Sequence, residues 1–140
     1  VYYSRTFEGI GYAKYCRAPV PDDILLKDGE ITADLIDWDG KADTPILMGE
    51  EVFLDANEVA EGHEYSYISS ISISPSERYV AYTVDNLGNE EYTLVIKDMM
   101  TGNIVRDYGT DSGPGLVSDT ILWGNDDSTL FYLKDDDEWR

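Results

Sequence analysis

The chain has 140 residues, which suits one ordinary domain or part of a larger one. Its hydrophobic fraction of 42% is enough for a packed core, and its 11 tyrosines and 12 glycines favour strands joined by turns. The formal charge of −19 repels phosphates, which argues against nucleic acid as a partner and would attract cationic ligands. Acidity that merely keeps the protein soluble is the simpler explanation of that charge.

The single cysteine, Cys16, excludes an internal disulfide and CxxC zinc spacing. The sequence has no N-x-S/T acceptor, no signal peptide and no apolar run near the roughly 18 residues that span a membrane. These features predict a cytoplasmic protein without membrane contact. The chain begins at Val1 inside a strand-like run and ends on EWR after another, so we expect a piece of a longer polypeptide.

Strand and turn signals alternate from the N-terminus onward. VYYSRTF (1–7) and YAKYCRA (12–18) flank the glycine-containing EGIG, which is a hairpin pattern. The next segment, to residue 50, is acidic and carries three prolines and three glycines. We expect an extended surface insertion there, with short local structure around Ile31–Ile36. EVFLD (51–55) then indicates a strand, and NEVAEGHEY after it can form one turn of helix at most.

Four more strand-like runs follow, separated by the turn signals SPSE, NLGN and MTG. The runs are ISSISIS (68–74), RYVAYTVD (78–85), EYTLVIKD (91–98) and NIVRDY (103–108). Four short strands with tight turns predict an antiparallel meander, the unit of sandwiches, barrels and propeller blades.

An internal repeat narrows the architecture. ISPSERYVAY (73–82) and WGNDDSTLFY (123–132) match without a gap at an offset of 50 residues. A turn and a strand repeated at that distance are typical of stacked four-stranded blades. We therefore predict an all-β fold, a partial β-propeller of two to three blades. The predicted bounds are 1–55 with the insertion at about 18–50, then 64–115, then a truncated third blade from 116 to 140.

Aromatic residues in these strands are expected to pack between blades. They are Tyr2, Tyr3, Trp123, Phe131 and Tyr132.

The only histidine of the sequence, His63, lies among four carboxylates. These are Asp55, Glu58, Glu61 and Glu64, an arrangement that a metal site or an acid–base site would show. The stretch also stands between two strand signals, which predicts a connection between blades. On that interpretation His63 is a loop residue, and the acids act only through the negative electrostatic field that they create.

Other chemical motifs are absent or weak. No G-x-S-x-G occurs, and Ser112 in DSGPG lacks the context of a nucleophile elbow. DWDGKAD (37–43) has its glycine fourth, whereas a calcium loop needs it sixth. DDDE (135–138) and DD (126–127) are expected to be solvated turns, and nothing selects a glycosidase pair among the 29 acids. Cys16 is expected to be a small buried side chain, and no metal or cofactor is predicted.

Three stretches, in order, carry a family resemblance. They are VYYSRTFEGIGYAKYCR; LDANEVAEGHEY with S-P-S-x-R-Y-V-A-Y and Y-T-L-x-I-K-D-x-x-T-G after it; and ILWGNDDSTLFYLKDD. Together they closely resemble the start of the β-propeller in the oligopeptidase B group of the prolyl oligopeptidase family of serine peptidases. The likeness covers about 1–17 and 50–135. The acidic segment 18–50 is expanded relative to the short connection usual in the family.

The resemblance implies a seven-bladed propeller joined to an α/β-hydrolase domain that holds the catalytic serine, aspartate and histidine. It also implies cleavage after Lys or Arg in short peptides, with the propeller excluding folded proteins from the catalytic cavity. No triad position of the family falls within these 140 residues, so we expect no catalytic residue here and no activity of the piece alone. Its implied partners are basic peptides, the catalytic domain and the remaining blades.

Acidic loop residues are the candidates for substrate steering or interdomain contact. They are Glu61, Glu64, Glu90 and Glu91, where charge reversal should raise the KM for Arg-containing peptides. Two other functions stay open: a propeller scaffold that binds a partner protein without catalysis, and an independent acidic β-sandwich that binds a ligand. A G-x-S-x-G region after further blades would favour the peptidase, and blades alone would favour the scaffold.

Overall fold

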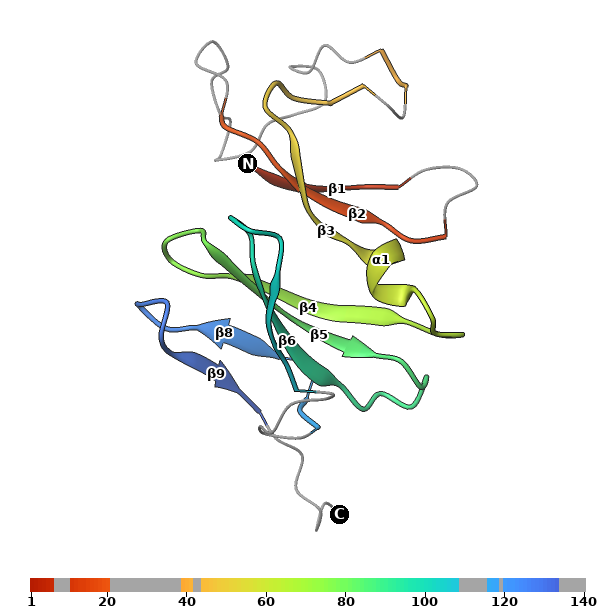
Figure 1. The fold of residues 1–140 in the computed structure, drawn as a ribbon, viewed down its shortest axis with the longest axis vertical. Coiled ribbons are helices and arrows are strands. Elements are labelled where there is room, and N and C mark those ends of the chain that lie inside the picture. The colour runs from red at the N-terminus through yellow and green to blue at the C-terminus, as the bar shows by residue number, and fades with distance from the viewer. Residues whose placement is uncertain (7–10, 21–38, 42–43, 109–115, 119, 134–140) are drawn as a thin grey trace. The chain divides into compact units, whose positions relative to one another are not determined.

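A computed structural model describes residues 1–6, 11–20, 39–41, 44–108, 116–118 and 120–133. These residues form nine strands and one short helix (Figure 1). The chain divides into two compact units, Val1–Val59 and Ala60–Arg140. The structure confirms the predicted all-β, antiparallel class.

The first unit holds a three-stranded antiparallel sheet in the order β1-β2-β3. Its strands are β1 (Tyr2–Arg5), β2 (Lys14–Arg17) and β3 (Glu51–Asp55), and the helix α1 (Ala56–Ala60) follows directly. Asn57 fixes the start of this helix to the hairpin, because its side chain accepts from the Tyr12 N–H and donates to the Tyr12 carbonyl. The predicted hairpin and the predicted single turn of helix are confirmed.

The described ends of the acidic insertion are fastened to this sheet. Glu50 forms a 2.7 Å ion pair with Arg5, and both side chains are only 7% exposed. The Tyr3 hydroxyl donates to the same carboxylate at 2.6 Å, and the Ile46 N–H donates to it at 3.2 Å. A buried ion pair is tolerated when further hydrogen bonds support it, and the Arg5 guanidinium also donates to the Thr44 carbonyl at 3.1 Å. The local structure expected around Ile31–Ile36 lies outside the described residues.

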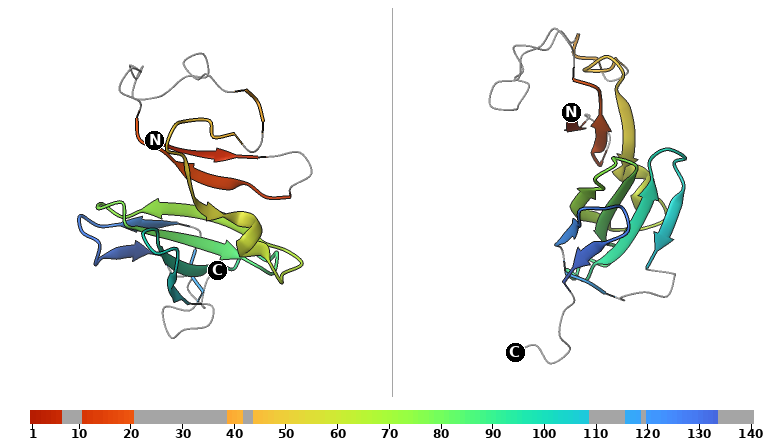
Figure 2. Two further views of the ribbon diagram at one scale, coloured as in Figure 1. Left: turned by 45° about the horizontal axis from the view of Figure 1, so that its top comes forward. Right: turned by 90° about the vertical axis from the view of Figure 1, so that its left-hand side faces the viewer.

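The second unit holds a four-stranded antiparallel meander in the order β4-β5-β6-β7. Its strands are β4 (Tyr67–Ile73), β5 (Tyr79–Asp85), β6 (Thr93–Asp98) and β7 (Ile104–Asp107) (Figure 2). β5 is the most enclosed strand, because every residue after Tyr79 is buried. The meander expected from the turn signals is therefore present in order and in bounds close to those predicted.

The 50-residue repeat is confirmed by strand register. β8 (Ile121–Trp123) and β9 (Leu130–Tyr132) pair as Ile121 with Tyr132 and Trp123 with Leu130. β4 and β5 pair as Ile71 with Tyr82 and Ile73 with Val80, which are the same positions 50 residues earlier. The turn hydrogen bond repeats too, since the amides of Ser74 and Gly124 donate to the carbonyls of Tyr79 and Thr129 at 2.8 Å each.

The β8–β9 pair packs against the four-stranded sheet through an apolar cluster. Its buried members are Ala81, Tyr92, Leu94, Val117, Ile121 and Trp123. Trp123 stacks on Tyr79 with ring centroids 6.3 Å apart, and its indole N–H donates to the Ser72 carbonyl at 2.9 Å.

The packing expected of Phe131 is absent among the described residues. Phe131 is 61% exposed because its side chain lies on the other face of the two-stranded sheet, which no described element covers. The two-residue alternation of a strand sends Leu130 and Tyr132 toward the cluster and Phe131 away from it.

Candidate functional site

The four candidate acids of the loops lie at one end of the four-stranded sheet. Tyr67, the first residue of β4, pairs with Asp85, the last residue of β5. The start of β6 lies at the same end, because it pairs with the end of β5. Glu61 and Glu64 precede β4, whereas Glu90 and Glu91 precede β6, and all four are exposed. The sequence separates these pairs by almost 30 residues, and the meander brings them to the same end.

Contact between the two loops supports this placement. A Cβ atom added to Gly88, in the β5–β6 loop, would lie 3.8 Å from the ring of Tyr65, which precedes β4. Among the described residues from 60 to 133, the Lys and Arg side chains lie in other segments. Arg78 is in the β4–β5 turn, Lys97 pairs with Val80 near that turn, and Arg106 lies within β7. The acidic end therefore carries an excess of negative charge.

A buried carboxylate organises the β5–β6 loop. Asp85 is 2% exposed, and its two oxygens accept from the amides of Leu87, Gly88 and Glu90 at 2.8–2.9 Å. Burial alone would raise the pKa of Asp85, but the backbone amides of the loop together lower it below its ordinary value. Glu90 has a φ of 61°, a conformation that non-glycine residues rarely adopt. The sequence indicated a turn here but gave no sign that Asp85 holds it together.

His63 is an exposed loop residue, as its position between strands predicted. Its backbone N–H donates to the Ala60 carbonyl at 3.0 Å. Asp55, one of the four acids, accepts from the Asn57 side chain at 2.8 Å and lies 3.9 Å from the Lys14 ammonium. No group of three or more His, Cys, Asp or Glu side chains in the described part of the chain is placed to hold a metal ion.

Cys16 is fully buried in β2, which agrees with a structural role. Burial raises the pKa of its thiol, with a further rise from the charge of Glu50, so the thiol is poorly suited to act as a nucleophile. Ser112 and DDDE (135–138) lie outside the described residues, as do 37–38 and 42–43 of DWDGKAD. No helix in the described ranges is long and apolar enough to cross a membrane.

The opposite end of the sheet is held by polar contacts between turns. The Ser76 hydroxyl, in the β4–β5 turn, donates to Asp127 in the β8–β9 turn, and the Ser76 N–H donates to the same carboxylate at 3.2 Å. Arg78 donates to Asp98 at 3.0 Å, beside the β6–β7 turn. In the predicted solvated turn at 126–127, Asp126 is exposed but Asp127 is half-buried and joins two sheets, which the sequence did not indicate.

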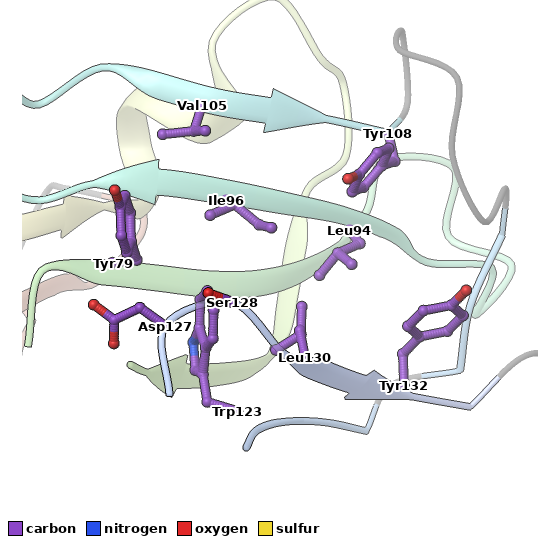
Figure 3. Close-up of a pocket in the computed structure, with 10 residues that line it drawn as sticks. All are labelled: Tyr79, Leu94, Ile96, Val105, Tyr108, Trp123, Asp127, Ser128, Leu130 and Tyr132. Atoms are coloured by element: carbon purple, nitrogen blue, oxygen red, sulfur yellow. The ribbon is translucent and has the colours of Figure 1, made fainter. Parts of the chain in front are cut away.

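A cavity of about 440 Å³ lies between the four-stranded sheet and the β8–β9 pair (Figure 3). Its lining residues are Tyr79, Leu94, Ile96, Val105, Tyr108, Trp123, Asp127, Ser128, Leu130 and Tyr132. Most of these side chains are aromatic or aliphatic, and no pair of them forms a nucleophile and a base. The cavity therefore has the character of a packing surface and not of a catalytic centre.

Comparison with known proteins identifies the architecture. The family model described as prolyl oligopeptidase, N-terminal β-propeller domain, matches residues 1–140. The chain belongs to the prolyl oligopeptidase family. Among curated prolyl oligopeptidase relatives, dipeptidyl aminopeptidase BI of Pseudoxanthomonas mexicana is 31% identical over 140 residues, which are 98% of this chain and 17% of that protein. Protease 2 of Moraxella lacunata is 26% identical over 99% of this chain and 17% of its own length.

Solved structures give the same prolyl oligopeptidase assignment. Oligopeptidase B from Leishmania major matches 96% of this chain with a TM-score of 0.67 and 27% identity. Oligopeptidase B from Trypanosoma brucei matches with a TM-score of 0.61 at 23% identity, which supports the fold alone. This chain spans 16% of the Leishmania chain and about one-sixth of the curated relatives. It thus corresponds to part of the N-terminal propeller of the prolyl oligopeptidase family.

Proposed function

We propose that this chain is the non-catalytic propeller portion of a cytoplasmic serine oligopeptidase that cleaves short peptides after Lys or Arg. The observation that carries the proposal is the match of the whole chain to the propeller domain of prolyl oligopeptidases. The described residues support a non-catalytic role, because their one histidine is an exposed loop residue and their one cysteine is buried. The catalytic serine, aspartate and histidine would then come from another domain of the parent protein.

The role proposed for the propeller is to restrict access to that catalytic domain. In this role, the stacked sheets β4–β7 and β8–β9, which share an apolar cluster, form a rigid boundary that limits access by size. An extended peptide can enter, whereas a folded protein cannot.

The acidic end of the sheet supports the proposed preference for basic peptides. Exposed carboxylates at Glu61, Glu64, Glu90 and Glu91 create a negative potential with no described Lys or Arg of the same unit beside it. Such a potential raises the local concentration of a cationic substrate and has little effect on a neutral one.

The full-length parent protein tests the catalytic part of this proposal. A fluorophosphonate reagent should label one serine, and the same protein should hydrolyse an Arg-containing peptide but spare that sequence within a folded domain. Absence of labelling and hydrolysis would contradict the peptidase and favour the propeller scaffold, which binds a partner without catalysis.

A matched pair of substitutions tests the proposed electrostatic steering of basic peptides by the acidic end of the sheet. Glu90 and Glu77 are both exposed, both have φ near 60° and both flank β-strands of the same sheet, but at opposite ends. In the parent enzyme, Glu90→Lys should raise the KM for an Arg-containing peptide by about two- to five-fold, the size expected for exposed charge pairs. Glu77→Lys should leave that KM unchanged.

Added salt separates an electrostatic effect from a steric one. Because exposed charges are screened over about 10 Å at 0.1 M salt, the effect of Glu90→Lys should shrink as NaCl is raised. An unchanged KM for Glu90→Lys, or an equal rise for Glu77→Lys, would reject steering by the acidic end.

A further inference from the structure

A hydroxyl–carboxylate contact joins two sheets of the second unit and has no role in the proposed function. Ser76 lies in the turn between β4 and β5, and its hydroxyl donates to the carboxylate of Asp127 in the turn between β8 and β9. The Ser76 N–H donates to the same carboxylate at 3.2 Å. Ser76 is exposed, whereas the apolar cluster that also joins these sheets is buried. An enzyme can therefore reach this hydroxyl from solvent.

The Ser76 oxygen lies near groups of opposite charge. The hydrogen bond from Ser76 is the main cause that lowers the pKa of Asp127, and the positive charge of Arg78 makes a smaller contribution. The Arg78 N–H donates to the Ser76 oxygen at 3.3 Å, and the Arg78 guanidinium, which is 47% exposed, pairs with Asp98 at 3.0 Å. A neutral hydroxyl suits Asp127 because it donates a hydrogen bond. An anion at the same position would be repelled by Asp127 and attracted by Arg78.

We propose that Ser76 is a phosphorylation site and that its phosphorylation opens the junction between the two sheets. A serine kinase transfers the γ-phosphoryl group of ATP to the Ser76 oxygen. An O–P bond forms there, the bond from the γ-phosphorus to the bridging oxygen breaks, ADP leaves, and the hydroxyl proton passes to a base of the kinase. The phosphoserine has lost the hydrogen that bonds Asp127 and carries a charge of about −1.5 to −2 at pH 7. Repulsion from Asp127 then replaces the hydrogen bond, and Arg78 becomes the favourable partner.

The other charges of the two turns act in the same direction. Residues 74–78 and 124–129 contain the carboxylates of Glu77, Asp126 and Asp127, and their one cation is Arg78. A phosphate added to this set increases an existing excess of negative charge. Like charges held close together destabilise the conformation that holds them, so the added phosphate favours separation of the turns.

Two other serines of these turns do not meet the same conditions. Ser74 precedes a proline and also lowers the pKa of Asp127 through a hydrogen bond, but it is only 2% exposed, so a kinase cannot reach it. Ser128 is exposed, but its N–H donates to Asp126 within the same turn at 2.9 Å and joins no sheets. Ser128 is therefore a matched control for Ser76.

The conformation of the β4–β5 turn favours local opening. Glu77 has a φ of 64°, which non-glycine residues rarely adopt, and its N–H donates to the Ser74 carbonyl at 2.8 Å. A kinase binds the segment around its target residue in an extended conformation. Opening of this turn relieves the unfavourable φ of Glu77 and presents Ser76 in that conformation.

Mass spectrometry of the parent protein, isolated with phosphatase inhibitors from cells that make it, tests the modification. The peptide that contains Ser76 should carry a phosphate, which phosphatase treatment removes and Ser76→Ala abolishes. Ser128→Ala should leave that phosphate in place. A peptide without phosphate, or with phosphate on a residue other than Ser76, would overturn the proposal.

Hydrogen exchange in the same protein tests the effect on the junction. The amides of residues 124–129 should exchange at least ~3-fold faster in the phosphorylated protein than after phosphatase treatment, because the β8–β9 turn loses its contact with Ser76. Ser76→Glu should reproduce this increase, and Asp127→Asn added to it should reduce the increase, because the amide can donate to the new carboxylate. Ser128→Glu should not reproduce it. Equal exchange with and without the phosphate would overturn the proposal.

These measurements do not depend on peptidase activity. A parent protein that lacks activity but shows the phosphate and the faster exchange would contradict the proposed function and support the switch. An active peptidase without phosphate on Ser76 would do the reverse.

Discussion

At the scale of single residues, the buried carboxylates in the described part of this acidic chain accept hydrogen bonds from several donors. Asp85 accepts from three loop amides, and Asp98 accepts from Arg78 and from the Met100 N–H at 2.9 Å. Glu50 pairs with Arg5 and accepts from Tyr3. A buried acid without such partners would be strongly destabilising, so these contacts decide which of the 29 acids can lie inside.

The Asp85 loop gives a prediction at this scale. Asp85→Ala leaves the amides of Leu87, Gly88 and Glu90 without their acceptor, so it should lower the Tm and speed hydrogen exchange in residues 86–90. Thermal unfolding and exchange mass spectrometry measure both effects. Glu91→Ala, an exposed change in the same loop, should alter neither, and equal effects of the two would contradict a special role for Asp85.

The pH dependence of this contribution has a definite sign. The folded pKa of Asp85 is lowered, so its stabilising effect is complete above the unfolded pKa of about 3.9 and is lost as the pH falls through the folded value. The Tm difference between the original chain and Asp85→Ala should therefore be constant near neutral pH and narrow below about pH 4. A difference that widened in acid would contradict this assignment.

At the scale of elements, a turn and the strand after it form the repeated unit, and the aromatic side chain before the turn joins consecutive sheets. Trp123 stands where Ile73 stands in the preceding sheet, at the last position of its strand. Its ring stacks on Tyr79 and its N–H reaches the Ser72 carbonyl, so one side chain contributes both apolar contact and a directional hydrogen bond between sheets.

Substitution of this residue tests the junction. In the 1–140 chain, Trp123→Ala should lower the free energy of unfolding by about 3–5 kcal/mol, because it opens a large hole in the shared cluster. Leu122→Ala, at the adjacent residue that is 63% exposed, should cost less than about 0.5 kcal/mol. Urea denaturation measures both, and similar losses would show that β8–β9 does not pack as described.

Strand positions were predictable because alternation and turn residues act locally. The runs RYVAYTVD and EYTLVIKD predicted β5 and β6 to within two residues, and the 50-residue offset of the sequence repeat recurs in the register of β8 and β9. The long-range polar contacts were not predictable. Nothing local distinguishes Asp127 from Asp126, because Asp127 accepts from Ser76, 51 residues away, whereas Asp126 accepts from Ser128. The contacts of Asp85 are local, with amides two to five residues further along, but the turn signal alone did not single out this carboxylate.

At the scale of the whole molecule, the charge is unevenly placed over the second unit. Among its described Lys and Arg residues, Arg78 and Lys97 lie at or near the β4–β5 turn, at the end opposite the loops that carry Glu61, Glu64, Glu90 and Glu91, and Arg106 lies within β7. The acids at one end therefore add to one another, whereas those at the other end are partly neutralised, as Asp98 is by Arg78. The described acids of this unit are thus concentrated at one end, which is what steering of a cationic substrate would require.

The buried fastening of the acidic insertion has a consequence for how this chain can vary. Pro19 and Gly49 touch, since a Cβ atom on Gly49 would lie 3.1 Å from the proline ring, and Gly49 has a φ of 79° that favours glycine. The described ends of the excursion therefore lie close together, next to the end of β2 and the start of β3. Such a site tolerates gain or loss of sequence between close ends, and it is where a foreign domain could be grafted without disturbing the propeller.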